Sequence, residues 1–437
     1  MDYLPNVIFA IALLLGIGFF VSNVLKLVRN IKLGKDLDRS DNKPERWKNM
    51  ARIALGQSKM VSRPIAGFLH IVVYIGFIVI NIEVLEIIID GLFGTHRVFQ
   101  PLLGNSIYGF LIGTFEILAF LVLVAVIIFW LRRNIVQLKR FMSKEMKGWP
   151  KNDGNLILYF EIVLMSLFIL MNATDYSFQQ AGFGNPISQF VAPWFSEYPL
   201  ETLSSIEHTA WWAHIIGILI FLNYLYYSKH LHILLAFPNT FYANLQPKGQ
   251  FNNLSSVTKE VRMMMDPDAD PYAMPEEGAE EEIPEKFGAS DVTDLNWVQL
   301  LNAYTCTECG RCTSSCPANM TGKELSPRAI MMKTRDRLEE VGRNIDSNKG
   351  TFKDDGKQLL NDYITPEELW ACTSCNACVE ECPIDIDPLS IIMDMRRFLV
   401  MEQSAAPQEL NMMMTNIENN GAPWQYNQQD RLNWKDE

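Results

Sequence analysis

The chain has 437 residues, enough for two or three domains, and a formal net charge of −12. This acidic balance argues against a nucleic-acid-binding surface. Hydrophobic residues make up 49% of the sequence, and nearly all long apolar runs lie before about residue 236. The composition therefore predicts a membrane domain followed by a polar, soluble domain.

Five apolar segments are long enough to cross a lipid bilayer. We expect them at residues 7–28, 64–90, 107–131, 156–172 and 209–227. The first has no basic region before it and no A-x-A site after it, so we interpret it as a retained helix rather than a signal peptide.

Loop charge predicts the orientation of these segments. The loop after the first segment is strongly basic, with eleven Lys or Arg between Lys26 and Arg63, and the loop after the third is also basic. The loop over residues 174–208 has no Lys or Arg. Since basic loops stay in the cytoplasm, we expect an outside N-terminus and a cytoplasmic second half in a bacterial inner membrane.

Histidines in the apolar segments suggest a haem site. His214 and His232 are eighteen residues apart, so a continuous helix would place them on one face, roughly 27 Å apart. His70 lies roughly 10 Å inside the second segment, at the depth of the lower end of the fifth. We expect His70 and His232 to hold a haem b near the inner surface, with His230 as the alternative to His232. The competing interpretation is hydrogen-bonded or interfacial histidines.

A second, outer haem is the open question at this stage. His214 lies at a suitable depth, but Ile80 occupies the position in the second segment where a partner histidine would be needed. His96 and His208 are the alternative partners. The sequence thus leaves the number of haems at one or two.

We interpret residues 237–290 as an acidic linker. It is rich in Pro and Glu, with an acidic run at 276–285, and such composition favours little regular structure. It is either a solvated tether or an acidic docking strip.

All eight cysteines lie in two copies of C-x2-C-x2-C-x3-C-P, which binds [4Fe-4S] clusters. In this pattern the first three cysteines of a run hold one cluster and the fourth reaches the other. We therefore expect one cluster on Cys306, Cys309, Cys312 and Cys382, and another on Cys372, Cys375, Cys378 and Cys316. Structural zinc is the alternative, but a zinc site usually takes its ligands as separated pairs and does not require a third Cys at this spacing.

The 55 residues between Cys316 and Cys372 predict helices around the clusters. Ser326 and Pro327 form a helix start, and Thr365 begins a capping-box sequence that ends in Glu368. We expect a helical dicluster domain over residues 291–400 and an interaction tail over 401–437.

Two family resemblances follow from these motifs. The histidine pattern resembles the cytochrome b subunit of respiratory nitrate reductase, in which His70 and His232 would match the inner haem ligands and His214 one outer ligand. The segments WWAHIIGILIFLNYLYYSKHLHI, DLNWVQLLNAYTCTECGRC and CPANMTGKELSPR resemble the heterodisulfide-reductase-related iron–sulfur family, which includes electron-transfer-flavoprotein:menaquinone oxidoreductases. The resemblance implies an all-α protein, in which a five-helix transmembrane cytochrome b bundle (residues 1–236) precedes a cytoplasmic α-helical dicluster [4Fe-4S] ferredoxin domain.

The resemblance also implies partners. Members of that family usually carry a domain with CCG motifs, and this sequence has no CCG, Rossmann fingerprint or P-loop. We therefore expect a CCG-motif iron–sulfur partner protein, an electron-transfer flavoprotein as a further partner, and menaquinone or ubiquinone as the membrane substrate. A chain that oxidises quinol and reduces a cytoplasmic disulfide or sulfur compound is one alternative. A non-catalytic redox sensor or membrane anchor is another.

Overall fold

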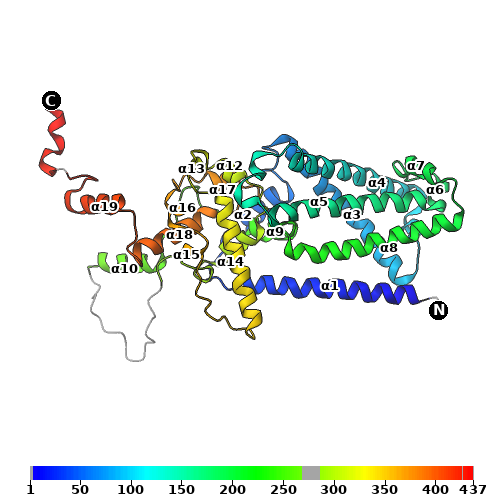
Figure 1. The fold of residues 1–437 in the computed structure, drawn as a ribbon, viewed down its shortest axis with the longest axis horizontal. Coiled ribbons are helices and arrows are strands. Elements are labelled where there is room, and N and C mark those ends of the chain that lie inside the picture. The colour runs from blue at the N-terminus through cyan, green and yellow to red at the C-terminus, as the bar shows by residue number, and fades with distance from the viewer. Residues whose placement is uncertain (1–2, 268–285, 426, 437) are drawn as a thin grey trace.

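The computed structural model describes residues 3–267, 286–425 and 427–436 (Figure 1). Within these ranges the chain forms helices and two isolated β-bridges, with no β-strand. Long helices form a bundle at one end of the molecule, and a compact group of mostly shorter helices packs against one end of this bundle (Figure 1). The predicted helical fold class is confirmed.

Five helices of the bundle are long and apolar enough to cross a membrane, as predicted. Four of them extend beyond their predicted segments, whereas α8 begins nine residues earlier than predicted and ends at Tyr224, three residues before the predicted end. Their bounds are α1 (Leu4–Ile31), α3 (Pro64–Phe93), α4 (Phe99–Asn134), α5 (Trp149–Thr174) and α8 (Leu200–Tyr224).

These helices pack in a closed ring, in which α1 contacts both α3 and α8, and α4 and α5 complete the circuit. Phe9 of α1 is almost completely buried against Gly91 of α3, where a Cβ atom would lie 2.6 Å from the Phe9 ring. The absence of a side chain at Gly91 therefore lets α1 approach the bundle. Short elements connect the long helices: α2 (Lys43–Met50), a π-turn (Ala51–Leu55), 3₁₀ turns at Lys139–Phe141, Lys144–Met146 and Ala192–Phe195, α6 (Tyr176–Ala181) and α7 (Ser188–Val191).

The expectation of one continuous helix through His214 and His232 is wrong. After α8 the chain forms a 3₁₀ turn (Leu225–Tyr227), becomes extended at Ser228 and forms a second 3₁₀ turn (Lys229–Leu231). The Ser228 side chain accepts a hydrogen bond from the His230 N–H, which offers the backbone an alternative to helical pairing. His232 then begins a separate helix, α9 (His232–Phe241).

The second half contains the cysteine domain, which we define as residues 286–401. Ser326 caps its longest helix, and Thr365 and Glu368 form the predicted capping box at α16. The helices are α11 (Trp297–Thr305), α12 (Arg311–Ser314), α13 (Pro317–Met320), α14 (Pro327–Ser347), α15 (Leu359–Asp362), α16 (Pro366–Trp370), α17 (Ala377–Glu381) and α18 (Pro388–Met401), with a 3₁₀ turn at Val292–Asp294.

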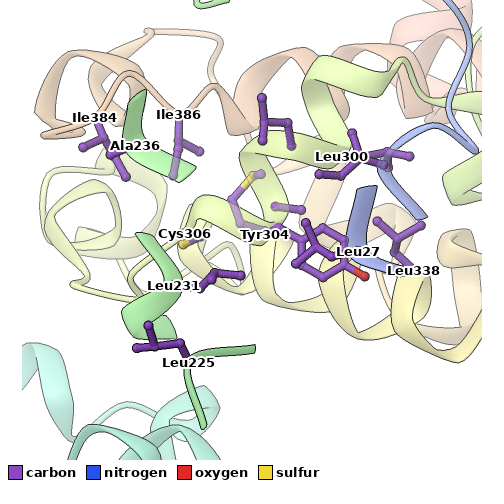
Figure 2. Packing of buried hydrophobic residues seen from close by; sticks show 14 of the residues in the cluster. Leu27, Leu225, Leu231, Ala236, Leu300, Tyr304, Cys306, Leu338, Ile384 and Ile386 are labelled. Carbon is purple, nitrogen blue, oxygen red and sulfur yellow. The ribbon is translucent and has the colours of Figure 1, made fainter. Parts of the chain in front are cut away.

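One apolar core joins the bundle to the cysteine domain (Figure 2). Leu231 and Ala236, from the segment after α8, lie beside Cys306, Ile384 and Ile386 of the cysteine domain (Figure 2). In the same core, the C-terminal end of α1 contributes Leu27, which lies next to Tyr304 and Leu338 (Figure 2). This packing fixes the cysteine domain against the bundle.

The linker and the tail differ from the body of the protein. The predicted linker contains the end of α9 and a further helix, α10 (Ser255–Met265), while the acidic run at 276–285 lies outside the described residues. After α18 the chain leaves the cysteine domain as α19 (Gln408–Asn420), which has no buried residue, and a 3₁₀ segment (Gln428–Lys435). This tail projects away from the bundle (Figure 1).

Candidate functional site

The two cysteine runs share an unusual backbone conformation. Glu308 (φ 55°) and Gly310 (φ 71°) of the first run occupy the left-handed region, as do Ser374 (φ 58°) and Asn376 (φ 63°) at the matching positions of the second. Non-glycine residues rarely adopt this conformation, so its repetition indicates that both loops are shaped in the same way. In the second run the Ser374 N–H donates to the Cys372 Sγ at 3.4 Å, a contact of the kind that tunes iron–sulfur clusters.

The fold brings the two cysteine runs side by side. Cys306, Cys309 and Cys312 line one cavity with Cys378 and Cys382, so the end of the second run lies beside the start of the first. Cys316 in turn lies close enough to Cys372 and Cys378 to interact with both electrostatically. Among the described residues, no three His, Cys, Asp or Glu side chains converge as a single metal ion requires. Ligation by these two sets stays a prediction.

Burial keeps most of these thiols neutral when they hold no metal. It raises the pKa of the Cys306 thiol to about 11 and that of Cys382 to about 12. Binding of iron would displace these protons, so cluster assembly and folding of the loops are coupled. Cys375 alone among the eight is exposed, so the set that contains it faces solvent.

The fold brings His70 of α3 and His232 of α9 together at the end of the bundle that packs against the cysteine domain. Their ring centres lie 6.5 Å apart, with an angle of 40° between the ring planes. The Nδ1 atom of His70 is buried and has no hydrogen-bond partner within the described ranges. A purely structural, hydrogen-bonded role therefore does not account for that atom.

His232 is held in a defined orientation. Its Nδ1–H donates to the Lys229 carbonyl oxygen at 3.1 Å, which leaves Nε2 for a metal. Burial lowers the pKa of His232, and it lowers the pKa of His230 to about 3, so both imidazoles are in the neutral, metal-binding form. The His230 ring lies 5.5 Å from that of His232, with an angle of 83° between the ring planes.

The outer histidines do not form such a pair. His214 is buried in α8, and its ring lies 6.1 Å from that of Phe168. Phe168 and Ile80 belong to the same apolar core. His208 instead accepts a hydrogen bond from the Trp212 indole, and His96 lies 3.4 Å from the Asp175 carboxylate. Within the described ranges, no other histidine ring contacts His214.

A buried charge cluster links the histidine pair to the first cysteine run. Lys229 forms an ion pair with Glu308, the residue before Cys309, and its Nζ atom lies 3.6 Å from the Asp153 carboxylate of α5. Arg335 of α14 binds the other Glu308 oxygen at 2.9 Å. Although burial raises the pKa of Glu308, Lys229 and Arg335 outweigh that effect and hold it below its ordinary value.

Helix α9 makes a second link, to the end of the second cysteine run. Asn239 donates to the Ile384 carbonyl oxygen at 2.7 Å, and Asn302 of α11 donates to the Asn239 side chain at 3.0 Å. Ile384 follows Cys382 by two residues, so one helix connects His232 to this cysteine. Sequence reasoning missed Glu308, Asn239 and Asn302, because only tertiary contacts distinguish them from other polar residues.

Comparison with known proteins supports the iron–sulfur assignment. Residues 305–386 match the family model of the 4Fe-4S dicluster domain. This match confirms the predicted dicluster domain. No solved structure shows significant similarity to the chain.

Curated relatives match nearly the whole chain. It is 29% identical, over 98% of its length, to a probable iron-sulfur-binding oxidoreductase, FadF, of Bacillus subtilis (strain 168). It is 25% identical, again over 98%, to an EtfAB:quinone oxidoreductase of Syntrophomonas wolfei. The chain spans only 60% and 59% of the lengths of these two proteins.

A shorter match involves the cysteine-rich half. Over 108 residues the chain is 31% identical to one of the subunits of a CoB-CoM heterodisulfide reductase of Methanosarcina acetivorans, which covers 25% of this chain and 53% of that protein. The names of these relatives agree with the predicted class, an oxidoreductase-type electron-transfer protein. The resemblance to nitrate-reductase cytochrome b stays a prediction.

Proposed function

We propose that the chain is a membrane-bound electron-transfer subunit of a quinone oxidoreductase. It would pass electrons between a cytoplasmic iron–sulfur or flavoprotein partner, two [4Fe-4S] clusters, haem b and menaquinone or ubiquinone. One observation supports this proposal more strongly than any other. The first cysteine run and the His70–His232 pair are tied together by Lys229 and α9, at the inner end of a bundle of apolar helices.

The histidine pair fits an iron held between two imidazoles. A bond between a metal and an imidazole nitrogen is about 2 Å long, so two rings that share one iron place their centres roughly 6 Å apart. The observed 6.5 Å agrees with this separation. Haem b at this position supplies one-electron transfer. His70 and His232 would hold it, and the Lys229 carbonyl would orient His232.

In this proposal the cysteine sets and the histidine pair act in series. The set with the exposed Cys375 faces solvent, where a partner can approach. The set with Cys306 and Cys309 lies at the junction, where Lys229 binds Glu308. The proposed partners are a CCG-motif iron–sulfur protein and an electron-transfer flavoprotein. This proposal is supported by the quinone oxidoreductase activity in the name of one relative.

The decisive experiment measures haem b and non-haem iron per chain, with a reduced-minus-oxidised spectrum of the detergent-solubilised protein. We expect about eight non-haem irons per chain and haem b in the wild type. His70→Ala and His232→Ala should each abolish the inner haem and leave the iron content intact. His208→Ala, at an exposed histidine, is the control for the inner site and should retain the inner haem and the iron.

An unchanged haem spectrum in His70→Ala would refute the ligand assignment. About eight irons without haem in the wild type would make the histidines structural, and would move the quinone reaction next to the cysteine domain.

Reverse electron flow, from quinol to a cytoplasmic disulfide or sulfur compound, is the second candidate function. The similarity of the cysteine-rich half to part of a heterodisulfide reductase favours it. Adding quinol to the isolated protein and following cluster reduction distinguishes the two directions, because only a quinol-oxidising protein should be reduced rapidly and extensively. Stable isolation without any quinone turnover would favour the sensor or anchor instead.

A further inference from the structure

Cationic side chains gather around one pocket at the inner end of the bundle. This pocket has a volume of about 700 Å³ and lies between the start of α3 and the segment that follows α4. Ser314 and Glu381 of the cysteine domain form one wall. Its basic lining residues, which define the basic junction pocket, are Arg63, Arg132, Lys139 and Arg140.

The positive charge of this pocket is poorly compensated. Glu381 is the one carboxylate among the lining residues, and it lies 3.4 Å from Arg63. Within the described ranges, Arg132 and Lys139 form no ion pair, and the buried Nε atom of Arg140 has no hydrogen-bond partner. Burial, and then the neighbouring arginines, lower the pKa of Arg140 despite an opposing effect of Cys309. Four cations around one carboxylate thus present an anion site.

The surroundings of the pocket are those of a lipid headgroup. Helix α3 begins at Pro64 and α4 ends at Asn134, so the pocket lies where the apolar spans meet the aqueous phase. Close by, Ile65 (64% exposed) and Phe68 (68% exposed) of α3 present apolar surface outward. A free inorganic anion would make no apolar contact with this surface, whereas the acyl chains of a lipid would cover it. A quinone ring is neutral and would leave the four charges uncompensated.

We propose that the basic junction pocket binds the phosphate headgroup of an anionic phospholipid of the surrounding bilayer. Basic pockets between transmembrane helices on the cytoplasmic side are suited to such headgroups. Ser314 lies between Cys312 and Cys316, and Glu381 precedes Cys382, so the bound lipid would connect the bundle with both cysteine runs. This inference does not depend on the proposed redox function.

The test compares lipid binding to the delipidated full-length protein in detergent, by native mass spectrometry. We expect retention of cardiolipin or phosphatidylglycerol in preference to phosphatidylcholine. The double variant Arg132→Gln/Lys139→Gln should bind the anionic lipid roughly 30-fold more weakly, since each basic residue near such a headgroup contributes about a fivefold gain. The control Lys144→Gln/Lys147→Gln removes the same charge from the segment that follows α4, outside the pocket, and should bind normally.

Iron content and gel filtration establish that the variants are folded. Equal binding by the pocket and control variants would overturn the proposal, as would equal retention of phosphatidylcholine. Competition by millimolar inorganic phosphate would instead identify a free-phosphate site, and retention of menaquinone in place of lipid would identify a quinone pocket. Both outcomes would refute the phospholipid.

Discussion

Lys229 offers the sharpest test of how the bundle and the cysteine domain are joined. Its side chain is 9% exposed, and its partners Glu308 and Asp153 are 2% and 3% exposed. Lys229→Met keeps the length of the side chain and removes its charge, so both carboxylates lose a buried counter-ion. The backbone carbonyl that orients His232 is retained, so haem binding should persist.

The expected loss of stability in Lys229→Met depends on the partners that the two carboxylates retain. Removing one partner of a buried ion pair costs roughly 3–5 kcal/mol, because the other charge stays desolvated and unpaired. Glu308 retains Arg335 at 2.9 Å, and Asp153 retains the Tyr224 hydroxyl at 2.5 Å. We therefore expect the lower end of this range, about 3 kcal/mol.

The assay is denaturant-induced loss of cluster absorbance, which reports on the cysteine domain rather than on the whole protein. Lys147→Met, at an exposed lysine in the loop before α5, is the matched control and should change stability by less than about 0.5 kcal/mol. If the pair is coupled, Glu308→Gln should cost less in the Lys229→Met background than in the wild type. Additive effects, or a Lys229→Met variant as stable as the control, would refute the argument.

Three further predictions address other parts of the chain. Cys382→Ser should remove the cluster that Cys306, Cys309 and Cys312 hold, and with it about half of the non-haem iron, as measured by iron analysis and electron paramagnetic resonance. Loss of the other cluster alone would contradict the assignment of Cys382 to the cluster of the first run. Arg337→Met removes a fully buried guanidinium that binds Asp355 at 2.6 Å, and should cost roughly 3–5 kcal/mol and speed hydrogen exchange over residues 350–363; an Arg337→Lys variant as stable as wild type would count against the bidentate pairing. His96 donates a hydrogen bond to the Asp175 carboxylate, which raises the pKa of His96. The stabilisation of the loop between α3 and α4 should therefore be complete below about pH 6.5 and decline as pH rises through the raised pKa. Thermal unfolding between about pH 6 and 9 should show this decline in wild type but not in His96→Gln.

The cysteine chemistry was predictable from sequence because its information is local. Three ligands of each set lie within seven residues, and the spacing alone defines the motif. The capping residues Ser326 and Thr365 were predictable for the same reason, since each acts on a backbone N–H three residues away. Long apolar runs likewise predicted all five helices of the bundle.

The geometry around His232 was harder to predict from the sequence. The spacing of eighteen residues from His214 fitted a continuous helix, and one serine hydroxyl is a weak local signal for a break. The break matters, because it turns His232 into the first residue of α9 and brings His230 beside it. The pairing with His70 was nevertheless anticipated, because depth in the membrane constrains it independently of helix continuity.

The two cysteine runs differ at positions between their cysteines, and these differences carry information that the cysteine spacing does not. Glu308 and Arg311 of the first run correspond to Ser374 and Ala377 of the second. Glu308 binds Lys229, and Arg311, which is almost completely buried, donates to the Lys59 carbonyl oxygen at 3.0 Å. Both contacts attach the first run to segments that flank the membrane helices.

Ser374 and Ala377 make no such contact, and the second run is attached instead through Glu381, which pairs with Arg63, and through backbone carbonyls that accept from Lys59. This run also contains the exposed Cys375. Buried charges require partners, whereas small neutral residues at the same positions do not. The difference between two otherwise matching runs therefore indicates which of them is attached to the bundle by buried charges. It also explains why exchanging Glu308 and Arg311 for their counterparts should weaken the junction while leaving all eight cysteines in place.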